Sequence, residues 1–221
     1  MKQLELISPS PDERIDLAIK RAMALYCNRL KTGYYPVGLE ATFQFYFARI
    51  LESVLSTLVI DNEMFQVLLE DNNPLDSQKD YVDIVVVYQS PNSDPLKYFI
   101  ELKFKKKSDS APDLGVIESY IDMFVLDRHK QRGNCQKGYY VFLTNLQTYI
   151  NKPRQGTRVE LPMHEGATIV ANKKYTVSGV AAQKASFKYP NGFRFSADHI
   201  IEYNEFTVKD KEFWYYIICI E

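Results

Sequence analysis

Apolar residues recur every three or four positions through the first sixty residues, which is the spacing of one face of a helix. Residues 10–13 form a typical helix start, with Ser10 as the cap, proline at the first helical position and Glu13 completing a capping box. We predict a helix from there to Gly33 and a second helix from about residue 37 to 59. The apolar stripe of the second helix is Leu39, Phe43, Phe47, Ile50, Val54 and Leu58.

Beyond residue 80 the apolar residues come in short runs rich in β-branched side chains, which is typical of strands. Residues 81–88 and 97–104 form two such runs, and the Ser, Pro, Asn and Asp residues between them indicate a turn, so the pair predicts a hairpin. A helix is predicted over 113–130 and a buried central strand over 138–144. The earlier segment 61–80 fits either a short helix or a strand, followed by a loop that contains Pro74.

After residue 144 short apolar runs alternate with turn residues. Asn191-Gly192 between aromatic flanks predicts a hairpin, and Phe213–Ile220 predicts a last strand. We therefore predict a core over residues 1–144 and a β-rich extension over 145–221 that packs on the same domain. The extension either continues the sheet or forms a small subdomain. The order of elements favours an α/β fold with a central mixed β-sheet flanked by helices.

Composition narrows the class of protein. The 221 residues are 46% hydrophobic and 25% charged, as in an ordinary globular domain, and the formal net charge of −1 means that any nucleic-acid-binding surface must be local. Three cysteines without a C-x-x-C pair favour a reducing cytoplasm over a disulfide framework. The start of the chain is unlike a signal peptide, and no apolar run is long enough to predict a membrane span.

Three polar residues in the predicted hairpin are the strongest candidates for chemistry. Asp83 lies in a run of valine and isoleucine, where a carboxylate is costly to bury without a metal, a cation or hydrogen bonds. Glu101 and Lys103 are two residues apart on the next strand and therefore share one face. If the hairpin forms, Asp83 lies beside them. Two carboxylates can hold Mg²⁺, and a neighbouring lysine can orient the attacking water or neutralise charge on a phosphate.

The order Asp83, seventeen residues, then Glu101-Leu102-Lys103 resembles the motif of the PD-(D/E)XK nuclease superfamily. The resemblance covers roughly residues 37–144 and includes the order helix, hairpin, helix, strand. It implies a restriction-endonuclease-like core and an endonuclease that hydrolyses DNA phosphodiester bonds through a Mg²⁺-activated water, with Mn²⁺ as a substitute. It also implies that Asp83 and Glu101 bind the metal and that Lys103 acts at the water. Val82 stands where the family motif has proline.

Members of that family often add an acidic residue from a helix before the hairpin, and two glutamates are candidates here. With a turn of about 100° per residue, Glu40 falls at the edge of the apolar stripe and Glu52 falls on the opposite face. We therefore assign the additional role to Glu40 and expect Glu52 to face water. The alternative for Glu40 is a solvated residue at a helix start, where carboxylates are favoured.

Two basic groups are candidates for phosphate contacts. The first group is Lys105, Lys106 and Lys107, and the second is Arg128, Lys130 and Arg132 around His129, which we expect at the surface. The alternative for the first group is a solvated strand end. The alternative for the second group is a set of cations that complement the dipole at a helix C-terminus. DNA is the predicted partner, with RNA as an alternative, and a palindrome-cutting enzyme would be a homodimer.

Two other interpretations stay open. In the first, the chain is a catalytically inactive nucleic-acid-binding or assembly module with the same fold. In the second, Asp83, Glu101 and Lys103 form an ordinary cluster of ion pairs with no role in nucleic-acid chemistry, which the near-neutral net charge permits.

Overall fold

The structure is a computed structural model that describes residues 7–60, 62–73, 81–91, 93–109, 112–152, 161–176 and 192–221. The chain divides into an N-terminal unit, Met1–Phe99, and a C-terminal unit, Ile100–Glu221. The loop predicted around Pro74 and the Asn191 half of the predicted hairpin lie outside the described residues. The predicted division at residue 144 stays a prediction.

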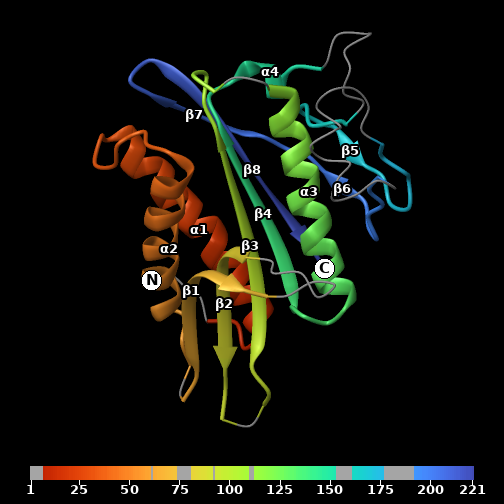
Figure 1. The fold of residues 1–221 in the computed structure, drawn as a ribbon. Coiled ribbons are helices and arrows are strands. Elements are labelled where there is room, and N and C mark those ends of the chain that lie inside the picture. Colours follow the sequence, from red (N-terminus) through yellow and green to blue (C-terminus); the bar gives the residue numbers. More distant parts are fainter. Residues whose placement is uncertain are drawn as a thin grey trace, which may run out of the picture. The chain divides into compact units, whose positions relative to one another are not determined.

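Within the described residues, the chain begins with two helices and three strands, continues through a helix, a strand and a short helix, and ends with four strands (Figure 1). The elements are α1 Pro11–Lys31, α2 Glu40–Ser56, β1 Met64–Asn72, β2 Tyr81–Gln89, β3 Leu96–Lys105, α3 Pro112–Gln131, β4 Lys137–Thr144, α4 Gln147–Ile150, β5 Thr168–Ile169, β6 His199–Ile200, β7 Asn204–Val208 and β8 Lys211–Ile220. Six strands follow one another in the order β1-β2-β3-β4-β8-β7, and β3 belongs to both units. The fold is α/β with a mixed six-stranded sheet and flanking helices, which confirms the coarse prediction. Within the described residues, no helix is both long and apolar enough to cross a membrane.

Helix α1 of the N-terminal unit begins and ends where the sequence predicts. The Ser10 hydroxyl accepts a hydrogen bond from the Glu13 backbone N–H at 3.4 Å, and Gly33 takes a positive φ of 73° just after the helix. The second half of the predicted capping box differs, because the Glu13 carboxylate accepts from the Ser8 hydroxyl at 2.5 Å. The Ser10 N–H donates to that same Ser8 oxygen, so both groups are satisfied by a residue outside the predicted motif.

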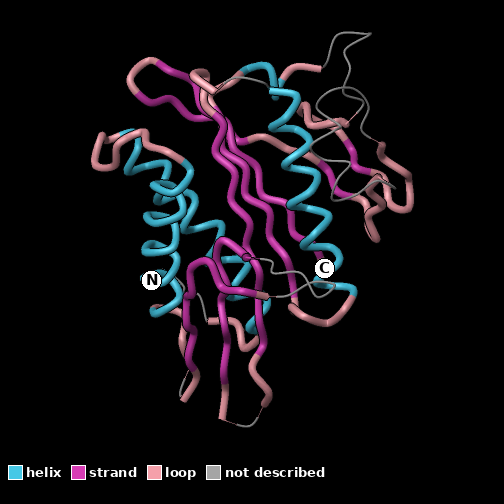
Figure 2. Tube along the Cα trace, viewed as in Figure 1, coloured by secondary structure: helices cyan, strands magenta, loops and turns pink. Residues whose placement is uncertain are grey.

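Helix α2 packs against α1 through its apolar stripe. Phe43, Phe47, Ile50 and Val54 are buried as predicted, but Leu39 is 66% exposed because it precedes the first helical turn and does not share the helical face. Strand β1 resolves the ambiguous segment, since it pairs antiparallel with β2 over its length. The two paired helices and these strands can be followed in Figures 1 and 2.

A buried arginine ties α1 to the rest of the N-terminal unit. Arg14 is 1% exposed and donates to both carboxylate oxygens of Glu63, at 2.5 and 3.1 Å, and to the Leu58 carbonyl at 2.9 Å. Its guanidinium also lies over the rings of Phe65 and Tyr88, and the Tyr88 hydroxyl donates to Glu63 at 2.6 Å. The guanidinium N–H groups of Arg14 match the two carboxylate oxygens of Glu63, so the buried positive charge of Arg14 is paired with a negative charge.

This pair makes the N-terminal unit sensitive to acid. Hydrogen bonds from Arg14, with burial opposing them, lower the pKa of Glu63 to about 2. Because the folded pKa is depressed, the stabilisation is present above the ordinary pKa of about 4.3 and is lost as the pH falls from there towards 2. We expect urea unfolding to show a loss of up to about 3 kcal/mol from this group between pH 5 and pH 2. The Glu63→Gln variant should show a correspondingly shallower pH dependence, and an unchanged slope would contradict this assignment.

The C-terminal unit has a core of strands with α3 packed against them. Strand β4 pairs antiparallel with β8 and β8 with β7, and α3 packs on β4 and β8 (Figure 2). The predicted central strand and last strand are thus both confirmed. The region after residue 144 does both things that the sequence left open, because β7 and β8 join the large sheet while β5 and β6 form a separate two-stranded sheet.

Candidate active site

Asp83 lies in the N-terminal unit on β2, where it is half-buried between the buried residues Val82 and Ile84. The side-chain amide of Gln44 on α2 donates to the Asp83 carbonyl oxygen at 2.9 Å. Glu40 lies one helical turn before Gln44, and residues four apart share a helix face. The start of α2 that carries Glu40 is therefore on the side of the helix that meets β2, as the helical positions predict.

Glu40 is half-exposed at the first position of α2, whereas Glu52 is exposed. The exposure of Glu52 confirms that prediction. The location of Glu40 suits both interpretations given above, since a carboxylate in the first turn also complements the helix dipole. Its role in chemistry stays a prediction.

Glu101 and Lys103 lie in the C-terminal unit on the half-exposed face of β3. The alternation is clear in the burial of the strand, because Leu102 and Phe104 are buried while Glu101, Lys103 and Lys105 are not. This two-residue period is that of a strand with one core face, and it confirms the predicted face of each residue. The prediction that Asp83 lies beside this pair stays a prediction.

Two ion pairs join this face of β3 to α3. The Lys103 ammonium lies 3.3 Å from the Asp122 carboxylate, and the Lys105 ammonium lies 2.7 Å from that of Glu118. The spacings match, since two residues along a strand advance by about 6.6 Å and four residues along a helix advance by about 6 Å. The pairs run in opposite directions along the two elements, as they must when the chain turns back from the strand into the helix.

Asp122 and Glu118 are the ion-pair partners of the two β3 lysines, and sequence reasoning missed both of them. Their spacing of four places them on one face of α3, and that spacing was the available signal. The signal is weak alone, because carboxylates four apart are also common on solvated helix faces. Only the pairing of helix and strand identifies the lysines as their partners. Lys103 is 14% exposed and Asp122 is 23% exposed, so this pair is partly shielded from water.

The first basic group continues from β3 into the following loop. The Lys105 ammonium forms an ion pair with Glu118. The Lys105 carbonyl oxygen accepts a hydrogen bond from the Thr144 hydroxyl at 2.8 Å. Lys106 is half-buried and Lys107 is exposed, and the Lys107 N–H donates to the Asn145 side chain at 2.7 Å. These contacts fix the backbone of the run and leave the side chain of Lys107 facing water.

Lys107 also lines a pocket of about 380 Å³ on the C-terminal unit. The pocket includes a second lysine, Lys211, and the indole of Trp214. The lining also includes the carboxylate of Glu212, and Lys107 is the one member of the first basic group among the lining residues, so phosphate contact by that group stays a prediction.

The second basic group lies at the far end of α3. Arg128 is half-buried with its guanidinium over the ring of Phe124, and the Lys130 ammonium donates to the Gln136 carbonyl at 2.7 Å. Arg132 is exposed. From Glu118 to Lys130 the helix advances about 18 Å, so the two basic groups do not merge into one patch. Lys130 fits the helix-end alternative, because it satisfies a carbonyl beyond the helix C-terminus.

His129 is not at the surface as expected. It is fully buried, and its Nδ1 lies 3.1 Å from the Asn134 amide nitrogen. The neighbouring Asp127 is also fully buried and accepts hydrogen bonds from Ser196 and Gln131. The expectation failed because both polar side chains have partners, Asn134 for His129 and Gln131 with Ser196 for Asp127, and paired polar groups can be buried.

The close approach of α3 to its surroundings depends on Gly115. A Cβ added there would lie 2.2 Å from the Tyr149 hydroxyl and 3.1 Å from Lys105 Cε. We therefore expect Gly115→Ala to lower the free energy of unfolding by about 2 kcal/mol, although alanine ordinarily favours a helix over glycine. Urea unfolding tests this. Adding Tyr149→Phe should recover part of the loss because it removes the obstructing oxygen, whereas a stabilising effect of Gly115→Ala alone would contradict the contact.

Among the described residues, no three or more His, Cys, Asp or Glu side chains are grouped so that they could hold a metal ion. A metal bound through two carboxylates is a smaller set than this and stays a prediction. Comparisons with protein-family models, with curated proteins and with solved structures found no match to this chain.

Proposed function

We propose that the chain is a metal-dependent nuclease of the PD-(D/E)XK type that hydrolyses DNA phosphodiester bonds. The observation that carries the proposal is the half-exposed face of β3, which presents Glu101 and Lys103 together while the opposite face is buried. Asp83 is included because the sequence motif requires it and because it too is half-exposed within an apolar strand. RNA is the alternative substrate.

The donor set suits a hard cation. Asp83 and Glu101 offer carboxylate oxygens, which Mg²⁺ prefers, and a two-carboxylate set leaves coordination positions for water and substrate phosphate. A bound Mg²⁺ or Mn²⁺ would polarise the phosphate and acidify a water molecule. Both carboxylates are half-buried, so each retains access to solvent.

Lys103 has the role of a donor in this proposal. An ammonium group donates hydrogen bonds and accepts none, and the Asp122 carboxylate at 3.3 Å orients it. We infer that Lys103 directs its remaining N–H groups at a phosphate oxygen or at the attacking water, where it stabilises developing negative charge. Asp122 is then a positioning residue that acts through Lys103.

The proposal is tested by cleavage of plasmid DNA and of short duplex and single-stranded DNA, with Mg²⁺, Mn²⁺ or EDTA. Cleavage should require the metal and should fall at least about a hundredfold in Glu101→Gln and in Asp83→Asn. Glu118→Gln is the matched control, because it makes the same change on a glutamate that pairs only with Lys105 in the described ion pairs of this unit. Thermal melts with each metal separate binding from chemistry, because a bound ion raises the melting temperature by mass action.

One observation favours the inactive alternative. Lys103 and Lys105 both form ion pairs with carboxylates on α3, and these pairs hold the helix to β3. A purely structural role for the lysines would make the chain inactive. In that case neither metal would raise the melting temperature and none of the DNA substrates would be cleaved.

A further inference from the structure

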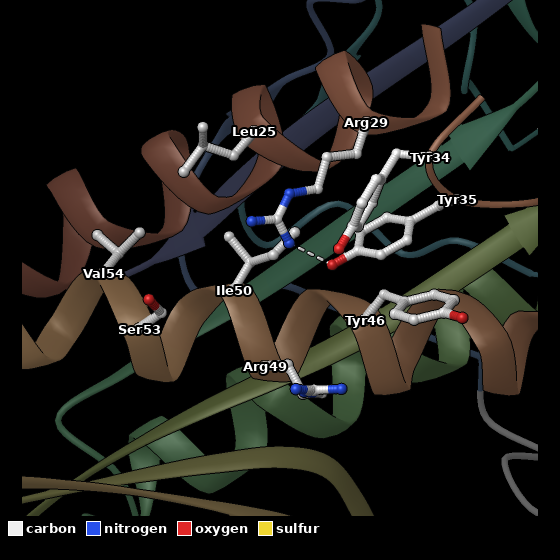
Figure 3. Close-up of a pocket in the computed structure, with 9 residues that line it drawn as sticks. All are labelled: Leu25, Arg29, Tyr34, Tyr35, Tyr46, Arg49, Ile50, Ser53 and Val54. Atoms are coloured by element: carbon white, nitrogen blue, oxygen red, sulfur yellow. Dashed lines mark hydrogen bonds between the residues drawn. The ribbon is translucent and has the colours of Figure 1, made fainter. Parts of the chain in front are cut away.

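A cleft between α1 and α2 carries a second set of functional groups, entirely within the N-terminal unit and outside the proposed active site. Its volume is about 500 Å³, which lies within the range of small-ligand sites. The cleft is lined by Leu25, Arg29, Tyr34, Tyr35, Tyr46, Arg49, Ile50, Ser53 and Val54 (Figure 3). This set combines two arginines with three tyrosines and contains no acidic residue.

Arg29 is held in place by aromatic rings. It donates to the Tyr35 hydroxyl, and its guanidinium carbon lies 5.2 Å from the centre of the Tyr35 ring and 5.5 Å from that of Tyr34. Tyr35 is buried and stacks on Tyr46 with ring centres 3.9 Å apart and planes at 16°. Figure 3 shows the guanidinium between the two helices and directed at these tyrosines. The cation is therefore positioned before any ligand arrives.

Within the part of the chain that the structure describes, no carboxylate forms an ion pair with the two arginines of the cleft, Arg29 and Arg49. Arg49 is exposed, with its guanidinium over the Phe45 ring, and Ser53 follows one helical turn later with an exposed hydroxyl. Two guanidinium groups and a hydroxyl offer the donors that a phosphate accepts, and the planar fork of arginine fits its oxygens.

The cleft also has an exposed aromatic ring, that of Tyr34. Tyr34 is 74% exposed, although the Arg29 guanidinium and the Tyr35 ring lie against it, so much of this large aromatic side chain still meets solvent. Exposed aromatic faces beside cations stack with the bases of nucleic acids, and the lining of the cleft also includes the apolar residues Leu25, Ile50 and Val54. An inorganic phosphate would contact only the two arginines, whereas a nucleotide would contact the arginines through its phosphate and the Tyr34 ring through its base.

We propose that this cleft binds a nucleotide, with the phosphate at Arg29 and Arg49 and the base against Tyr34. The ligand is either a free nucleotide or a nucleotide unit of a single strand, since both present the same chemistry. The proposal is independent of the nuclease proposal, because it uses different residues and requires neither metal nor cleavage.

The test measures binding by the full chain in EDTA, which prevents metal-dependent cleavage. A nucleoside monophosphate and inorganic phosphate are titrated by calorimetry, and a short labelled single-stranded DNA is titrated by fluorescence anisotropy. We expect the nucleotide or the strand to bind more tightly than inorganic phosphate. Preference for the strand identifies a strand site, and equal or better binding of the monophosphate identifies a free-nucleotide site.

Three variants assign the binding to the cleft. Arg49→Gln should weaken binding of every phosphate-bearing probe about tenfold, and Tyr34→Ala should weaken the nucleotide and the strand about tenfold while leaving inorganic phosphate unchanged. Both residues are exposed, so the fold should tolerate these changes. Lys20→Gln removes an exposed charge of α1 outside the cleft and should leave binding unchanged. Absence of nucleotide and strand binding, binding that ignores both cleft variants, or equal binding of a glutamate-rich peptide would overturn the proposal.

Discussion

Replacing Lys103 with methionine is expected to reduce metal-dependent DNA cleavage by about a hundred- to a thousandfold, the effect of removing one charge-stabilising donor from a reaction centre. Methionine keeps much of the apolar stem and removes the ammonium. Asp122 loses its partner in this variant, but it is 23% exposed and can be solvated, so the cost in stability should stay near 1 kcal/mol. Single-turnover cleavage and urea unfolding, measured on the same preparation, separate the two effects.

Lys105→Met is the control that makes this result specific. Lys105 lies two residues further along the same face of β3 and also pairs with α3, through Glu118 at 2.7 Å. If the Lys103–Asp122 and Lys105–Glu118 ion pairs only hold α3 to β3, the two variants should lose similar amounts of stability, and neither should change any cleavage activity. If the lysines only attract DNA, both should weaken binding and lessen its salt dependence to a similar degree. A large loss of the rate constant in Lys103→Met alone is the pattern that a reaction centre predicts.

Asp122 extends the same test. If Asp122 acts through Lys103, as we propose, Asp122→Asn should reduce cleavage less than Lys103→Met does, and combining the two should add little to the single loss. A purely structural role would instead change stability and leave the rate constant of cleavage unaltered.

The sequence predicted most elements because their local signals agree with their tertiary surroundings. Helix α1 has a serine cap at its start and a glycine of positive φ after its end. Successive side chains of a strand point to opposite faces of the sheet, so each residue of β3 has only two possible orientations. Glu101 and Lys103 could therefore be assigned to one face without a structure.

The errors share a different cause. The capping role assigned to Glu13, the surface position expected for His129 and the missed Asp122 all depend on which polar partners the fold brings to each group, whether these lie near it in the chain or far away. Ser8 accepts the Ser10 N–H that Glu13 was expected to bind, and Ser196 meets Asp127 from 69 residues away. Such partners satisfy polar groups that a sequence pattern assigns to solvent, and no local period encodes them.

Arg14 is the residue with the largest expected effect on stability. The residue precedes the apolar stripe of α1, where a sequence pattern assigns a cation to solvent, yet its side chain is 1% exposed. From α1, its contacts reach the segment before β1 through Leu58 and Glu63, and the paired strands β1 and β2 through Phe65 and Tyr88. Burial lowers the pKa of Arg14, but the hydrogen bonds and charge of Glu63 more than offset this and raise it, so the cation is favoured.

We expect Arg14→Met to lower the free energy of unfolding by about 3 to 5 kcal/mol, because breaking a buried ion pair leaves one charge without its partner. The melting temperature should fall by about 10 °C for a chain of this size. Lys20→Met is the control on the same helix, since Lys20 is exposed and its loss should change the free energy by no more than about 0.5 kcal/mol.

The double variant Arg14→Met with Glu63→Gln decides whether the cost lies in the pair or in the packing. Removing both charges removes the unpaired carboxylate, so the double variant should be more stable than Arg14→Met alone, and the coupling energy of the cycle measures the pair. If the double variant is instead less stable than the unsubstituted protein by the sum of the two single effects, the two side chains act independently. The guanidinium would then stabilise the unit mainly through the Leu58 carbonyl and the rings of Phe65 and Tyr88.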